Sequence, residues 1–304
     1  MNCDMHIHTT FSDGTLNEID ILEECKKRNL YYFSITDHDC VDFYLNTNIL
    51  NKIKEDGFKI ITGCEFICRV GGQPIEILGY GIDVKKAKEY LNLHAITQNK
   101  LNKIRLENIL MVFDKFNVKL HLKDLTPINN NILNNIFDAI KENADALKLV
   151  NAENPELLLN TNIFIRKGTN NPKSIFYIHP ELIYPSYKKI IEFIHNLGGI
   201  ASLAHPFQYG DNMTYVINNV VNAGIDAIEC YHYTTIDNIN KDYSKKDYLI
   251  SICKKHNLIF TGGSDFHYLD KYPKNQLNEL NIPLEVYNNI NNLIKAKKGL
   301  LQAV

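Results

Sequence analysis

Residues 4–14 read DMHIHTTFSDG, a short apolar run that ends in histidine and aspartate side chains. The run is typical of a β-strand, on which side chains two positions apart leave the same face. His6 and His8 can therefore bind one metal ion, and Asp13 follows on a loop where Gly14 allows a tight turn. Taken alone the pair of histidines is an ordinary feature, because core and surface histidines are common. Four further clusters of His, Asp or Glu along the chain strengthen the interpretation of a metal site.

These four clusters also follow short apolar runs that are typical of β-strands. Each places a His, Asp or Glu at the carboxyl end of its strand, and in a barrel of parallel strands those ends share the face that carries active sites. Imidazole and carboxylate groups without thiolates suit zinc, manganese or iron, and one ion cannot use so many ligands. The pattern predicts a multinuclear metal hydrolase. The clusters are Asp37-His38-Asp39, Gly63-Cys64-Glu65, Ala204-His205-Pro206 and Gly263-Ser264-Asp265-Phe266-His267.

Strand-like and helix-like segments alternate at both ends of the chain but not in its middle. From residue 84 to residue 184 the pattern is helical and irregular, and a structureless loop of that length inside a compact domain is uncommon. We therefore predict an α/β protein in which residues 1–83 and 185–304 form a metal-binding barrel and residues 84–184 form an inserted, mainly helical cap domain. The expected strands are Cys3–His8, Tyr31–Thr36, Phe58–Phe66, Ile75–Tyr80, Ile200–Ala204, Ala227–Tyr231 and Leu258–Gly262, with a hairpin turn at Gly71-Gly72.

The composition argues against several classes of protein. The 304 residues carry a net charge of −2, so no overall basic field is available to hold a nucleic-acid polymer. This favours a small substrate and leaves short oligonucleotides open. No apolar stretch approaches the roughly 20 residues of a membrane span, and the chain runs into Asp4 and His6 with no room for a signal peptide. Seven cysteines without a CxxC pair fit a reduced compartment, so we expect a cytoplasmic protein with no membrane partner.

Together the clusters resemble the PHP family (polymerase and histidinol phosphatase). The matching motifs are D-x-H-x-H-T-x-x-S-D-G at residues 4–14, I-T-D-H-D at 35–39, G-x-E at 63–65, A-H-P at 204–206 and G-S-D-x-H at 263–267. The chain looks most like stand-alone phosphoesterases that carry a helical insertion, and the likeness covers Cys3–Tyr80 and about Pro185–His267. The resemblance implies a distorted (β/α)7 barrel with sites for three metal ions. We expect two to three divalent ions, manganese, zinc or iron, per chain.

The same resemblance implies three sets of metal ligands, two of which share Glu65. Because a residue that bridges two ions controls both, we assign Glu65 a catalytic role. The sets are His6, His8, Glu65 and Asp265 for one ion, then Glu65, His205 and the residue at position 76 for a second, and Asp13, His38 and His267 for the third.

Position 76 departs from the family pattern. Family members usually carry histidine there, whereas residues 75–80 read IEILGY and place Glu76 at that position. A carboxylate oxygen can still bind the ion, and it suits manganese better than softer metals. Alternatively the second site is weakened or empty, or Glu76 faces solvent on an exposed hairpin.

The sequence defines the substrate contacts less well. His232 follows the strand Ala227–Tyr231 and matches a family position near the substrate phosphate, so it either contacts phosphate or protonates the leaving group. The alternative is a surface histidine. Arg105, Arg166 and Lys167 are candidate phosphate contacts, although basic residues on a helical segment usually face solvent. An R-P-H segment that some nucleotide-specific members carry is absent from the sequence.

We predict a metal-dependent phosphoesterase that hydrolyses a small phosphomonoester by attack of a hydroxide held between metal ions. By analogy with the family, a nucleoside monophosphate or 3′,5′-bisphosphate is the first choice of substrate, with Glu65 and His232 as catalytic residues. Histidinol-phosphate phosphatase and short-oligonucleotide exonuclease are alternative activities. A non-catalytic metal-binding protein is the alternative from another class, since Glu76 and the missing R-P-H segment depart from the family pattern.

Overall fold

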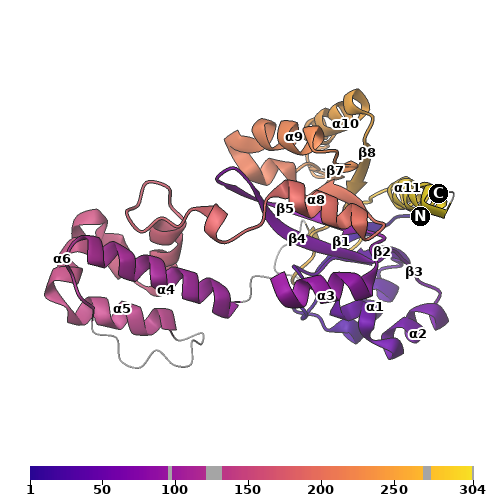
Figure 1. Ribbon diagram of the computed structural model, residues 1–304. Coiled ribbons are helices and arrows are strands. Elements are labelled where there is room, and N and C mark those ends of the chain that lie inside the picture. Colours follow the sequence, from indigo (N-terminus) through magenta and orange to yellow (C-terminus); the bar gives the residue numbers. More distant parts are fainter. Residues whose placement is uncertain (95–97, 121–131, 270–274, 303–304) are drawn as a thin grey trace. The chain divides into compact units, whose positions relative to one another are not determined.

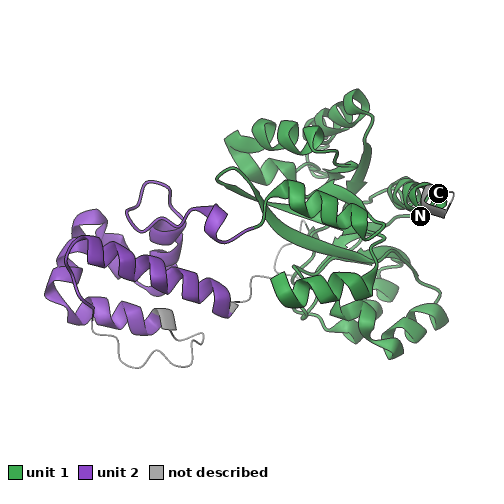
Figure 2. Ribbon diagram, viewed as in Figure 1, with its two compact units in different colours: residues 1–95, 185–304 green, residues 96–184 purple. Residues whose placement is uncertain are grey.

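The computed structural model describes residues 1–94, 98–120, 132–269 and 275–302. The chain forms two compact units, one from residues 1–95 and 185–304 and the other from residues 96–184 (Figure 2). The helix at residues 84–94 belongs to the first unit, so the second unit begins at residue 96 and not at the expected residue 84. The role of the second unit as a cap stays a prediction.

The first unit contains two β-sheets (Figure 1). A parallel three-stranded sheet has the order β1 (Asp4–Ile7), β2 (Tyr32–Ile35) and β3 (Lys59–Ile60). A five-stranded sheet has the order β4 (Gly63–Val70), β5 (Gln73–Tyr80), β6 (Ile200–Leu203), β7 (Ala227–Tyr231) and β8 (Ile259–Gly262). The neighbours β6, β7 and β8 run parallel, whereas β5 is antiparallel to both β4 and β6.

The strands are therefore not all parallel. The predicted hairpin is present, because Gly71 adopts a φ of 57° in the tight turn that reverses the chain between β4 and β5. Isolated bridges from Ile7 to Phe266 and from His38 to Glu65 link the two sheets. Within the described residues the strands nevertheless do not form one continuous closed sheet. The structure thus shows a mixed α/β fold, and the closed (β/α)7 barrel stays an expectation.

Helices cover the sheets of the first unit. Helix α8 illustrates why: Ile190, Ile191 and Ile194 lie on one face at helical spacing, and that face packs on β4 and β5 (Figure 1). Burying this stripe fixes the hairpin that carries two candidate ligands. The described helices of this unit are α1 (Glu18–Lys27), η1 (Asp42–Leu45), α2 (Thr47–Glu55), α3 (Val84–His94), α8 (Tyr187–Asn196), η5 (Pro206–Asn212), α9 (Met213–Asn222), α10 (Ser244–His256) and α11 (Leu284–Gln302).

The second unit is helical and has an apolar core of its own. Ile109, Phe113, Phe164 and Phe176 are buried within it. None of the described helices in either unit has the length and apolar character needed to cross a membrane. The described helices of the second unit are α4 (Gln98–Lys115), α5 (Ile132–Glu142), α6 (Ala144–Glu153), η2 (Pro155–Leu158), α7 (Thr161–Ile163), the π-helical turn η3 (Phe164–Thr169) and η4 (Pro180–Leu182).

Candidate metal centre

The buried carboxylate of Glu65 lies among imidazole rings from three other segments of the chain. Its Oε2 atom lies 3.0 Å from His6 Nε2 and 3.2 Å from His8 Nε2. The same oxygen is 3.2 Å from His38 Nδ1, and Oε1 is 3.2 Å from His205 Nε2. Burial alone raises the pKa of a carboxyl, yet the surrounding imidazoles, His6 first, hold the pKa of Glu65 well below its usual value. One carboxylate thus faces two directions at once, as a bridging ligand does.

Strand alternation explains why the two N-terminal histidines point to this site. On β1 the side chain of Ile7 enters the apolar core, so His6 and His8 project from the opposite face. Phe266 holds the backbone at the end of β1, because its carbonyl accepts from the His8 N–H at 2.9 Å. The spacing predicted from the sequence therefore brings both rings to Glu65.

Asp265 reaches the same cluster because the chain after β8 approaches β1 closely. Its N–H donates to the His6 carbonyl at 2.9 Å, and its Oδ1 atom lies 3.4 Å from both His6 Nε2 and His8 Nε2. Only glycine fits at position 263, since a Cβ there would lie 2.1 Å from the Cβ of His6. Burial raises the pKa of the Asp265 carboxyl, but nearby imidazoles, His6 first, outweigh burial and hold it well below its usual value.

We expect Gly263→Ala to lower the free energy of unfolding by about 2 kcal/mol, a typical cost of forcing extra volume into a packed site. The added methyl group meets backbone as well as side-chain atoms of His6, which cannot move without shifting β1. Urea unfolding followed by circular dichroism measures the change. Gly299→Ala, where a Cβ meets no atom within 4 Å, is the matched control. Equal stability of the two variants would contradict the close approach.

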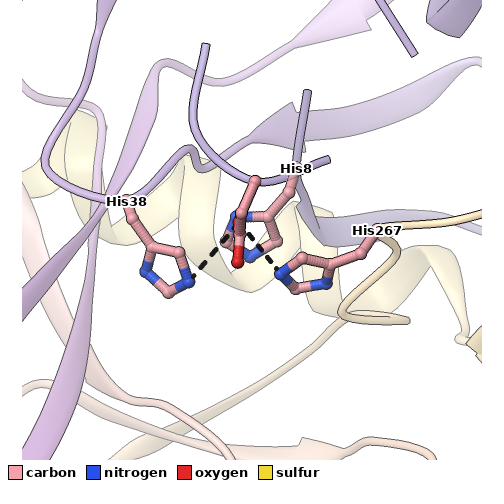
Figure 3. A group of neighbouring side chains, drawn as sticks. His8, His38 and His267 are labelled. Carbon is pink, nitrogen blue, oxygen red and sulfur yellow. Dashed lines mark ion pairs between the residues drawn. The ribbon is translucent and has the colours of Figure 1, made fainter. Parts of the chain in front are cut away.

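A second group of donor atoms surrounds Asp13. Figure 3 shows His8, His38 and His267 converging from separate segments of the chain. Asp13 Oδ1 lies 3.2 Å from His267 Nε2 and 3.8 Å from both His38 Nε2 and His8 Nδ1. Burial raises the pKa of Asp13, but the imidazoles, His267 first, lower it to about 2. The structure brings together the three residues expected for the third ion and adds His8.

Glu76 forms a third group with Glu65 and His38, and His205 lies beside this group. Across the hairpin Glu65 pairs with Leu78 and Ile67 with Glu76, so both glutamates leave the same face of the sheet. Glu76 Oε2 lies 3.1 Å from His205 Nε2, and Oε1 lies 3.9 Å from His38 Nδ1. The Glu76 side chain is 27% exposed and faces this cluster, so the alternative of a solvent-facing hairpin residue is wrong.

His232 is buried and not a surface residue. It follows β7, and its Nε2 atom lies 3.5 Å from Asp265 Oδ2. The N–H of Thr234 donates to His232 Nδ1 at 3.2 Å, which leaves Nε2 as the nitrogen that faces the site. Arg105 and the exposed Arg166 lie in the second unit, on α4 and η3. Their expected contact with a substrate phosphate stays a prediction.

Two further buried carboxylates lie in this region: Asp37, which the sequence offers as a group that orients the His38 ring, and Glu229, to which it assigns no role. Asp37 accepts hydrogen bonds from the Thr9 N–H, the Thr9 hydroxyl and the Ser12 hydroxyl at 2.6–2.7 Å, which fixes the loop that carries Asp13. Glu229 contacts His6 and His205. The sequence contains one indication that Glu229 has a role: a glutamate in the middle of the apolar strand Ala227–Tyr231 needs buried partners.

The donor atoms fit divalent cations. Buried His8 Nε2 and His38 Nδ1 have no hydrogen-bond partner among the described residues, although each lies 3.2 Å from Glu65 Oε2. Two donors that bind one ion at about 2.0–2.1 Å lie about 3.3 Å apart in tetrahedral geometry. The three groups are His6, His8, Glu65 and Asp265; His8, Asp13, His38 and His267; and His38, Glu65 and Glu76, each with donor atoms within 4.8 Å of one another.

Comparison with known proteins matches residues 4–277 to the PHP domain. A 5′-3′ exoribonuclease of Haemophilus influenzae is 24% identical over 87% of this chain and 89% of its own length. A 3′,5′-nucleoside bisphosphate phosphatase of Chromobacterium violaceum is 22% identical over 88% of this chain and 87% of its own length.

Two solved structures share the fold. A candidate metal-dependent phosphoesterase from Bifidobacterium adolescentis is 20% identical, with a TM-score of 0.58, over 95% of this chain and 94% of its own. An amidohydrolase from Chromobacterium violaceum with bound sulfate and no metal is 17% identical, with a TM-score of 0.60, over 98% of this chain and 97% of its own. At these identities the likeness concerns the fold alone.

Proposed function

We propose that this chain, which belongs to the PHP domain family, is a metal-dependent phosphoesterase that acts on a small phosphorylated substrate. The observation that carries the proposal is the position of Glu65, which belongs to two neighbouring donor groups and faces His6 with Oε2 and His205 with Oε1. Imidazole and carboxylate ligands around a shared carboxylate are typical of multinuclear hydrolases. A merely structural core would not gather so many titratable groups at one face of the sheets.

The candidate ligands fall into three sets, one for each ion. His6, His8 and Asp265 would hold one ion with Glu65, while His205 and Glu76 would hold a second and Asp13, His38 and His267 a third. When bound, such ions neutralise phosphoryl oxygens and activate water. His232 presents Nε2 beside Asp265, from where it can donate a hydrogen bond to a substrate oxygen. These groups are fixed before substrate arrives, so little reorganisation opposes the reaction.

A nucleoside 3′,5′-bisphosphate or monophosphate is our first choice of substrate. The relative named as a bisphosphate phosphatase supports it, and the net charge of −2 suits a small substrate better than a polymer. The relative named as an exoribonuclease supports the second candidate, trimming of short oligoribonucleotides from the 5′ end.

Metal content and substrate preference test the proposal together. Protein purified without chelator and supplemented with manganese should hold two to three ions per chain, counted by elemental analysis. It should release phosphate from para-nitrophenyl phosphate and, with a higher kcat/KM, from adenosine 3′,5′-bisphosphate, and chelation should remove both activities. Histidinol phosphate and a 5′-phosphorylated tetraribonucleotide complete the panel. Less than one equivalent of zinc, manganese and iron combined would sink the metal site, and a preference for the tetraribonucleotide would favour the exonuclease.

A further inference from the structure

Glu229 occupies the middle of β7, where its carboxylate lies between β1 and the end of β6. The side chain is fully buried. Its Oε1 atom lies 3.0 Å from His6 Nδ1, and its Oε2 atom accepts from the His205 N–H at 2.8 Å. Burying a carboxylate is costly unless its oxygens are bonded, and here both oxygens have a partner.

The contact with His6 decides which ring nitrogen carries the proton. Because a carboxylate only accepts, it selects the form of His6 with hydrogen on Nδ1. The lone pair of Nε2 then points to Glu65 Oε2 at 3.0 Å and Asp265 Oδ1 at 3.4 Å. A metal ion bound between Nε2 and these two oxygens would take the place of a proton on Nε2, while Glu229 keeps the proton on Nδ1. With the proton on Nε2 the ring could not bind the ion.

The contact with His205 holds a strained backbone. His205 has φ 26° and ψ 62°, and a positive φ is uncommon for residues other than glycine. The hydrogen bond from its N–H to Glu229 supports this conformation, which directs Nε2 toward Glu65 Oε1 and Glu76 Oε2.

We propose that Glu229 is a positioning residue that couples two ligands of the metal centre, His6 and His205. The four residues form a ring of contacts in which Glu65 and Glu229 alternate with the two histidines, and the link from His205 to Glu229 is made by the His205 backbone N–H. Within this ring Glu65 Oε2 lies beside His6 and Oε1 beside His205, and Glu229 contacts the same two residues on their other side. The inference rests on the proposed function, because it concerns the ions of that site.

Asp226 offers a matched control on the same part of the sheet. Just before β7 its Oδ2 atom accepts from His195 Nε2 at 2.7 Å and from the Ala201 N–H at 2.8 Å, so it joins a ring nitrogen and a backbone N–H through one oxygen, where Glu229 uses two. It also accepts from Lys297 Nζ at 2.6 Å. His195 and Ala201 belong to none of the donor groups around Glu65.

Glu229→Gln tests the coupling, because an amide has one acceptor oxygen and cannot accept from both partners. We expect zinc affinity, measured by competition with a chromogenic chelator, to fall about tenfold or more, as loss of a group that orients a metal ligand typically causes. Asp226→Asn should lower the melting temperature and leave zinc affinity within about twofold. Equal zinc affinity of wild type and Glu229→Gln would overturn the inference while leaving the metal site standing. A wild type that binds no zinc would overturn both.

A measurement on the unmodified protein does not depend on the variant folding. In zinc-loaded protein labelled with 15N-histidine, long-range proton–nitrogen spectra should show His6 protonated at Nδ1 and metal-bound at Nε2. Assignment follows from the signal lost in His6→Gln. A His6 ring protonated at Nε2 would overturn the proposal outright.

Discussion

Glu65→Gln is expected to lower kcat by at least about a hundredfold, the usual result of removing a preorganised charge from a reacting centre. The carboxylate faces His6, His8 and His38 with one oxygen and His205 with the other. An amide keeps one acceptor oxygen and turns an NH2 group toward the opposite partners, so it cannot bridge two ions. Phosphate release from para-nitrophenyl phosphate at saturating manganese measures the loss.

Glu24→Gln is the control for that substitution. Glu24 is also largely buried, and its carboxylate is paired with Arg28 and Lys27 on α1, outside the donor groups around Glu65. We expect it to reduce stability and leave kcat within about twofold. If both glutamine variants lose activity equally, and their melting temperatures fall equally, Glu65 acts on folding and not on catalysis.

The sequence predicts that several candidate ligands lie close together, because strand alternation is a local property. His6 and His8 share a face through the two-residue period of β1, and Asp265 follows β8 as the pattern predicts. The strand that carries Glu65 is different. One strand was expected at residues 58–66, but β3 ends at Ile60 and β4 begins at Gly63, which places Glu65 inside a strand. Glu65 faces the site because an isolated bridge joins it to His38, a residue distant in the sequence.

The start of α1 shows how tertiary contacts override a local motif. Residues 15–18 read as a capping box with Thr15 as the N-cap, yet Asn17 caps the helix by accepting from the N–H groups of Ile19 and Asp20. Thr15 instead donates its N–H to the His267 carbonyl at 2.9 Å. His267, a residue distant in sequence, therefore accepts from the Thr15 N–H that the motif assigned to the cap of the helix.

Sequence motifs do not predict the role of Glu229, because that role also depends on contacts between residues distant in the sequence. Its partners lie on β1 and beyond β6, and no spacing in the sequence joins them. A charged residue inside an apolar strand indicates only that some partner exists. By contrast, the helical pattern of residues 84–184 predicts an inserted helical domain but gives no position for Arg105 or Arg166 relative to a substrate.

Glu76→Ala is expected to weaken the binding of one manganese ion about a hundredfold. Loss of a group that only orients a ligand lowers metal affinity by up to about a hundredfold, so we expect at least that effect from loss of a direct ligand. The carboxylate lies 3.1 Å from His205 Nε2 and on the same face of the hairpin as Glu65. Without it His205 and Glu65 alone are too few ligands for a stable site. Calorimetric titration with manganese and with zinc measures affinity and stoichiometry. Glu55→Ala, at the exposed end of α2, is the control.

Glu76→His tests the same position in the opposite direction. Imidazole is a softer ligand than carboxylate and removes one negative charge, so zinc should bind more tightly relative to manganese by about tenfold or more. The wild type, with carboxylates from both Glu65 and Glu76 beside His205, should prefer manganese at that site. Unchanged stoichiometry and affinity in both Glu76 variants would remove Glu76 from the metal centre. The contact with His205 would then be a hydrogen bond between two side chains, and the centre would hold its ions without the second site.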